Sequence, residues 1–172
     1  PAQLLRRLKA AAYQFTAVTP ATHQRVLARP FSGKAKLRDI FGWNRPFNEG
    51  DLDPALLDLM RAADILDRHG AGWRSQVRVA SLGPDLFLHS AFPTDDPDSV
   101  FFGPDTYRFV RFIGKKAPGL SGARRVVDLG AGSGAGGIAA AKLIAGAQVT
   151  LVDPNGSALR LARINAAVAG AK

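Results

Sequence analysis

Two aspartates and a run of glycines are the residues whose types and spacing are best suited to chemistry. Asp128 stands inside an apolar stretch, residues 126–129, and glycines follow it at positions 130, 132 and 134. Asp153 ends a second apolar stretch. Glycines allow a tight turn and close backbone approach, and an acid after the second strand can accept hydrogen bonds from a ribose diol. The pattern predicts a cradle for a nucleotide-type cofactor.

The elements that must position these residues are a strand, a turn, a helix and a second strand. Residues 126–129 predict the first strand, residues 137–144 an alanine-rich helix, and residues 148–152 the second strand. Free N–H groups at the start of that helix favour an anionic or electron-rich part of a ligand.

Asp128 separates two classes of cofactor that use such a cradle. Gly132, Gly134 and Gly137 also satisfy the generic dinucleotide pattern, which alone is a weak signal. A buried carboxylate is costly unless it is paired or hydrogen-bonded. The cationic sulfonium and amino group of S-adenosylmethionine would compensate it, whereas a pyrophosphate would be repelled. The alternative is that Asp128 caps a turn by accepting backbone N–H bonds.

Over about residues 100–170 the chain resembles the class I S-adenosylmethionine-dependent methyltransferases, on the acid-x-Gly-x-Gly-x-Gly run and the acid after the second strand. The resemblance implies S-adenosyl-L-methionine as cofactor, with Asp153 at its ribose. The turn that would pass its methionine part is Gly130, Ala131, Gly132, Ser133 and Gly134. Residues 157–167 look like the branch that contains release-factor glutamine and ribosomal RNA guanine-N2 methyltransferases. Residues 100–109 look like that branch's lead-in segment, which would place Phe102 and Thr106 at the pocket wall. For Phe101, Phe102 and Tyr107, core packing is at least as good an interpretation as contact with the cofactor.

The same resemblance implies features that these 172 residues do not contain. A doubly wound sheet needs five or more strands, and two parallel ones are predicted here. The family's Asn-Pro-Pro-aromatic motif does not occur, so no catalytic residue is assigned. We expect an N-terminal fragment of a longer enzyme, inactive alone, with self-association through the unpaired edge of the first strand.

Composition sets broad limits. There is no cysteine, which removes disulfides, thiolate metal sites and thiol nucleophiles, and which fits a cytoplasmic protein. His23, His69 and His89 show no metal-ligand spacing, so we predict no metal site and expect each histidine at the surface or hydrogen-bonded in the core. The opening residues lack the long apolar stretch of a signal peptide.

Positive charge is concentrated at the N-terminus. Residues 1–45 hold nine Lys or Arg against one acid, Asp39, so this quarter carries +8 of the net +9. A phosphate-binding face and an ordinary solvated surface are about equally compatible with this density. The candidate nucleic-acid-binding residues are Arg6, Arg7, Lys9, Arg25, Arg29, Lys34, Lys36, Arg38 and Arg45.

The N-terminal part is predicted as a separate module over residues 1–91. We expect helices over residues 3–13, from Thr19 as N-cap, over residues 36–41, and from Asp53 to a stop at Gly70. Residues 75–81 and 86–91 alternate around a turn and predict a hairpin, which gives a winged-helix-like shape. A linker, 92–99, then leads to the start of an incomplete S-adenosylmethionine-binding domain, 100–172. The fold class is α/β, with the first half of a Rossmann-like domain after the helical module.

The sequence thus favours a methyltransferase that acts on a nitrogen of a macromolecule, with an amino group of RNA or DNA as the favoured acceptor. The nearest alternative is a glutamine side chain of a translation factor or ribosomal protein. Two alternatives belong to other functional classes: a non-catalytic basic binding module with a vestigial cradle, and a dinucleotide oxidoreductase.

Overall fold

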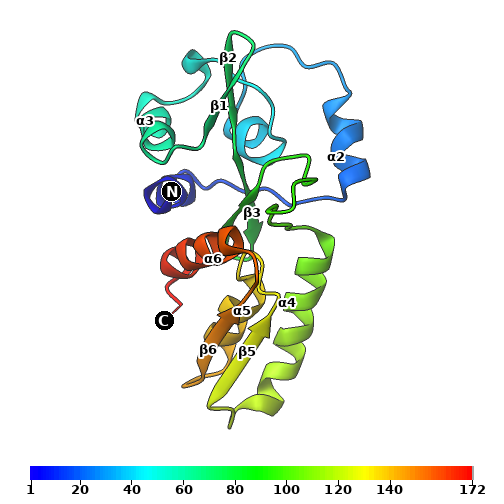
Figure 1. Cartoon of the computed structure of the whole chain (residues 1–172), viewed down its shortest axis with the longest axis vertical. Helices are drawn as coiled ribbons and strands as arrows, with labels where there is room; N and C mark the ends of the chain where they lie inside the picture. The colour runs from blue at the N-terminus through cyan, green and yellow to red at the C-terminus, as the bar shows by residue number, and fades with distance from the viewer. Residues whose placement is uncertain (172) are drawn as a thin grey trace.

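The computed structural model describes residues 1–171 and has three tiers along its long axis (Figure 1). Strands β1 (Leu66–His69) and β2 (Gly72–Ser75) lie at one end. Strands β5 (Arg125–Leu129) and β6 (Gln148–Val152) lie at the other end. Between them lies a hairpin of β3 (Val77–Leu82) and β4 (Asp85–Ser90). The protein is therefore a mixed α/β structure with three two-stranded sheets in its described part.

Helix starts in the N-terminal half follow local capping signals. Thr19 accepts a hydrogen bond from the Thr22 N–H and opens α2 (Pro20–Leu27). Asp53 accepts bonds from two N–H groups at the start of α3 (Pro54–Ala62). Both predicted starts are confirmed, because a side-chain oxygen before a proline satisfies N–H groups that lack partners within the helix. Helix α1 (Ala2–Ala10) buries three leucines and ends earlier than predicted.

One N-terminal prediction, the end of the helix that begins at Asp53, is wrong. Helix α3 stops at Ala62 and not at Gly70, because the chain turns through Asp64, at φ +51°, into the β1–β2 hairpin. Gly70 lies in the turn of that hairpin, whose strands the sequence analysis missed. Apolar spacing that suits a helix to Leu66 also suits a short strand there, so periodicity alone could not separate them. The short helix predicted at 36–41 is present with slightly shifted bounds, as the π-helical turn η1 (Arg38–Gly42). A 3₁₀ turn, η2 (Glu49–Asp51), precedes α3.

The β3–β4 hairpin is confirmed and is shared between the two halves of the molecule. Its antiparallel register runs from Val77 opposite Ser90 to Leu82 opposite Asp85. One face, with Val79 and Leu88, is part of the N-terminal core. The other face packs against residues of the C-terminal half. The alternation of side chains along a strand lets one hairpin serve both cores.

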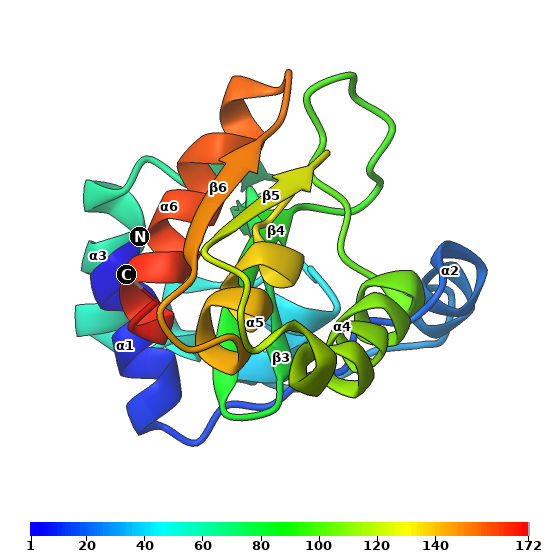
Figure 2. The ribbon, with the colours of Figure 1, turned by 90° about the horizontal axis from the view of Figure 1, so that it is seen from below.

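The C-terminal half is a parallel strand–helix–strand unit with helices on one side. Helix α4 (Pro104–Lys116) and a 3₁₀ turn, η3 (Ala117–Leu120), precede β5, and α5 (Ala135–Leu143) connects β5 to β6. The strands pair from Arg125 opposite Gln148 to Leu129 opposite Val152. Helix α5 packs against both strands and against α4, and Figure 2 shows the carboxyl ends of the strands pointing toward the loop between β4 and α4. On the sheet, Val127 and Leu129 remain 57% and 75% exposed.

Helix α6 (Gly156–Ala169) joins the two halves. It follows β6, yet it packs against β4 and α1, and Leu161, Ile164 and Val168 contact the N-terminal core. A second connection is ionic, because Asp85 at the hairpin tip pairs with Lys9 of α1 at 3.3 Å and with Lys142 of α5. No helix within residues 1–171 is long and apolar enough to cross a membrane.

Candidate cofactor site

A cavity of about 520 Å³ opens at the carboxyl ends of β5 and β6. Ligand sites in α/β sheets commonly lie outside the carboxyl ends of parallel strands. Its walls come from the turn after β5, the loop after β6, the segment before α4 and the first turns of α4 and α5. Its lining includes Phe101, Asp105, Thr106, Phe109, Asp128, Gly130, Ala131, Gly132, Ser133, Gly136, Asp153 and Asn155.

The glycine turn has an open side and a packed side. Gly130 and Gly132 have φ of +70° and +53°, and a Cβ built on either would meet no atom within 4 Å. At Gly134, with φ of +82°, a Cβ would lie 2.9 Å from the Cβ of Ala162 on α6. The first two glycines, which line the cavity, therefore have open space on the side of a Cβ, whereas Gly134 allows close packing against α6.

Asp128 is half-buried at the end of β5 and holds the start of α5. Its Oδ2 accepts a hydrogen bond of 2.7 Å from the Gly137 N–H. This is the capping role that the sequence left as an alternative, and it does not use the other carboxylate oxygen, which can still accept a bond. Burial raises the pKa of Asp128, and nearby Asp153 raises it further, although the Gly137 bond acts in the opposite direction. A cation in the cavity would stabilise the ionised form.

Asp153 connects the loop after β6 to the glycine turn. Its Oδ2 accepts from the Gly132 N–H at 2.8 Å, and its Oδ1 accepts from the Asn155 N–H at 2.9 Å. Asn155 in turn caps α6 and donates to the backbone oxygen of Asp98 at 2.8 Å. Each carboxylate oxygen has a further lone pair, so Asp153 can accept two more hydrogen bonds from a diol.

The charged side chains that line the cavity are all carboxylates. They are Asp105, Asp128 and Asp153, and no Lys or Arg is among the lining residues of the described chain. Asp105 also pairs with Arg108 at 2.9 Å, but both side chains are largely exposed, so water screens that pair. This arrangement favours a ligand with positive charge and disfavours a pyrophosphate.

The aromatic wall differs from the one expected. Thr106 lines the cavity, but Phe102 does not: it is 1% exposed and packs between Phe87 and Tyr107. Its neighbour Phe101, 45% exposed, lines the cavity instead. Side chains of consecutive residues in an extended segment point to opposite sides. A prediction that is wrong by one residue therefore names a core residue in place of a residue of the cavity wall.

Phe109 is a lining residue that the sequence analysis missed. It lies on α4 one turn after Thr106, and a Cβ on Gly136 would approach its ring to 2.5 Å, so the ring lies directly against the start of α5. Its position three residues after Thr106, on the same helix face, could have predicted that it lines the cavity.

The nine candidate basic residues do not gather at this cavity, because none of them lines it. Arg7, Lys34 and Lys36 do come together around a separate groove, which Asp51 and Asp53 also line. Two of the nine have internal partners: Lys9 pairs with Asp85, and Arg45 donates to the Val26 backbone oxygen at 2.7 Å. The remaining four of the nine are exposed, and they neither line this groove nor make these contacts: Arg6, Arg25, Arg29 and Arg38.

Two histidines are buried beside Arg78, away from the cavity. Because Arg78 can only donate, the Nδ1 of His23, 3.4 Å from its guanidinium, must accept, and the Nε2 then donates to the Trp43 backbone oxygen at 3.0 Å. Burial and Arg78 lower the pKa of His23 from 6.5 to about 4. His89 is fully buried and, among the described residues, its ring nitrogens have no side-chain or backbone partner, which differs from the satisfied histidine expected. Burial and Arg78 hold its pKa well below 6.5.

Within residues 1–171, no three His, Cys, Asp or Glu side chains are grouped as a metal ion would require.

The family model for the methyltransferase small domain matches residues 113–172, from the end of α4 onward. The search of curated proteins gives no match. The family match supports a methyltransferase of the small-domain class, a family that generally depends on S-adenosylmethionine.

Proposed function

We propose that the cavity at the ends of β5 and β6 binds S-adenosylmethionine and that the protein is an N-methyltransferase acting on a macromolecule. The observation that carries the cofactor is the combination of an open glycine turn with three lining carboxylates and, within residues 1–171, no lining Lys or Arg. A sulfonium and an amino group fit that charge, whereas the pyrophosphate of a dinucleotide does not. The match of residues 113–172 to the methyltransferase small domain supports the same class.

The chain's own residues bind and orient the cofactor in this proposal. Asp153 would accept the two ribose hydroxyls with the lone pairs that Gly132 and Asn155 leave free. Asp128 would face the positively charged end, and Phe101 and Phe109 would exclude water from the walls. When bound, S-adenosylmethionine supplies a methyl group on a cationic sulfur that an acceptor nitrogen can displace in line. Alignment of the two reactants then supplies most of the acceleration, and no residue described here is assigned as a catalyst.

For the acceptor we propose an amino group of RNA or DNA. The support is the net charge of +8 over residues 1–45 and the meeting of Arg7, Lys34 and Lys36 at one groove. Neutralised phosphates release counterions, so binding through this face would weaken steeply with salt.

The alternative acceptor, a glutamine side chain of a translation protein, has its own supporting observation. The same groove contains Asp51 and Asp53 beside apolar Ala35, Leu52 and Leu56, a mixed lining that suits a peptide better than a phosphate backbone. Binding of an RNA oligonucleotide between 50 and 200 mM salt separates the two. Loss of binding by about 10³-fold or more supports a phosphate face with several contacts, and an absence of RNA binding at low salt favours the peptide.

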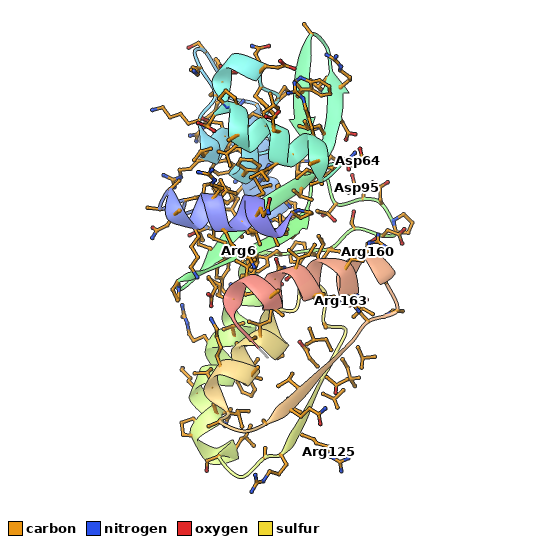
Figure 3. The ribbon with its side chains drawn as sticks, turned by 90° about the vertical axis from the view of Figure 1, so that its left-hand side faces the viewer. Arg6, Asp64, Asp95, Arg125, Arg160 and Arg163 are labelled. Carbon is orange, nitrogen blue, oxygen red and sulfur yellow. The ribbon has the colours of Figure 1, made fainter. Side chains whose placement is uncertain are left out.

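Calorimetric titration with S-adenosylhomocysteine tests the cofactor. We expect the wild-type chain to bind S-adenosylhomocysteine and not to bind NAD. Asp153→Asn should weaken binding by about 10- to 150-fold, because hydrogen bonds to charged groups contribute about 1.5–3 kcal/mol. Asp64→Asn is the matched control, since it removes one negative charge from an exposed residue that does not line the cavity and lies just before β1 (Figure 3). A folded wild-type chain that binds NAD, or binds neither ligand, would overturn the proposal.

A further inference from the structure

Asn165 of α6 is a fully buried polar side chain that the cofactor proposal does not use. Its Oδ1 accepts from the Leu88 N–H at 2.8 Å. Its Nδ2 donates to the Leu88 oxygen at 3.0 Å and to the Ser133 oxygen at 2.9 Å. The amide therefore makes three hydrogen bonds in a site closed to water.

These three bonds connect two parts of the molecule. Leu88 lies on β4, whose described sheet partner is β3, so the Asn165 amide satisfies backbone groups on the free edge of that hairpin. Ser133 is a buried member of the glycine turn and a lining residue of the cavity. Figure 3 shows why this is possible, because α6 lies between α1 and the β5–β6 sheet. Its labelled arginines, Arg160 and Arg163, are exposed, whereas Asn165 is buried.

The turn has different supports on its two ends. Its first residues are held from the β6 side, through Val152 and Asp153. The Ser133 carbonyl is held from the hairpin side, by Asn165. Because a peptide unit is planar, fixing this carbonyl also fixes the orientation of the Gly134 N–H, which donates to the Ala131 oxygen at 2.8 Å. The shape of the cradle thus depends on both halves of the protein.

We propose that Asn165 is a positioning residue that couples the β3–β4 hairpin to the cofactor cradle, so that cofactor affinity depends on its amide group. The proposal rests on the proposed function for the role of the cradle. Asn165 itself does not touch the cofactor, since it is not among the lining residues of the cavity.

Two variants and one matched control test this coupling in the full chain. Asn165→Asp keeps the shape but sets a carboxylate oxygen against two carbonyl oxygens, and Asn165→Ser is a milder change that loses the forked amide. Tyr13→Phe is the control, because the Tyr13 hydroxyl donates to the Val79 oxygen at 2.9 Å on the opposite edge of the same hairpin. It removes a buried hydrogen bond without reaching the glycine turn.

Affinity for S-adenosylhomocysteine is measured by calorimetry at a temperature where circular dichroism shows each variant to be folded. We expect Asn165→Ser to weaken binding by roughly tenfold, the size of a lost buried hydrogen bond that leaves a partner unsatisfied, and Asn165→Asp to weaken it more, because its charge faces two carbonyl oxygens. Tyr13→Phe should leave binding unchanged. Equal affinities of folded Asn165→Ser and wild type would overturn the proposal. Equal weakening by Tyr13→Phe would do so too, because it would reduce the effect to general destabilisation.

A second readout works without cofactor. Backbone amide NMR signals of residues 132–134 should shift in Asn165→Ser and stay in place in Tyr13→Phe. If wild type does not bind S-adenosylhomocysteine, the proposed function fails, and the NMR signals still decide whether Asn165 positions the turn. Unshifted signals would refute that positioning.

Discussion

Replacement of Gly130 by alanine tests two effects separately. One is the cost of a left-handed backbone conformation to stability, and the other is the loss of space for the cofactor, measured as affinity. Gly130 has φ of +70°, and its added Cβ would meet no protein atom within 4 Å. The folded chain should therefore lose only the left-handed penalty of an L-residue, about 1 kcal/mol, in its free energy of unfolding. The same methyl group would project into the proposed cofactor space. Overpacking by one methyl costs about 1–3 kcal/mol, which corresponds to a loss of about 5- to 150-fold in affinity.

Gly146→Ala provides the matched control. Gly146 has φ of +76°, is equally open, and lies in the turn before β6, away from the cavity. Urea unfolding should give both variants the same loss of stability, while calorimetry with S-adenosylhomocysteine should show weaker binding only for Gly130→Ala. Equal affinities in the two variants would refute the reasoning, because they would show that the open side of Gly130 does not face the ligand.

Two further predictions concern pH. Burial raises the pKa of Asp128, and the ammonium group of bound S-adenosylhomocysteine, whose sulfur is uncharged, favours the ionised carboxylate. Affinity for this ligand should therefore fall as pH drops through that pKa, and calorimetry at pH 5 and 8 should find this dependence reduced in Asp128→Asn. The second concerns stability: the folded chain keeps His23 neutral down to about pH 4, whereas the unfolded chain binds this proton below about 6.5. The stabilising contribution of His23 is therefore complete above pH 6.5 and declines as pH falls toward 4, by about 2 kcal/mol at pH 5. His23→Gln keeps one donor and one acceptor for Trp43 and Arg78 but does not titrate. Urea unfolding should show that its free energy of unfolding falls less between pH 7 and pH 5 than that of wild type, and equal falls would contradict this.

Local signals predicted local structure well. Thr19 and Asp53 were identified as helix caps because capping depends on residues two or three positions away. The turn between β3 and β4 and the strand, glycine turn and helix around Asp128 were likewise found within a residue or two. Where two local readings competed, the prediction failed, as at Leu66, which begins a strand and not the last turn of α3.

The side of the chain on which a residue packs was decided by tertiary structure. The sequence chose Phe102 for the pocket wall, but the hairpin residue Phe87 provides a buried partner for it, and Phe101 faces the cavity. Nothing within a few residues of either phenylalanine indicates which one meets that partner, because the contact crosses 15 positions of the chain.

By itself, the sequence determined the caps, the hairpin turn between β3 and β4 and the glycine turn after β5, because each depends on the conformation of a few neighbouring residues. Only the tertiary structure decided that Asp128 caps α5, that Asp85 joins α1 to α5, and that Asn165 joins β4 to Ser133. The physical reason is that a buried polar group must find partners wherever the folded chain brings them, and for Asn165 and Leu88 that is 77 positions away.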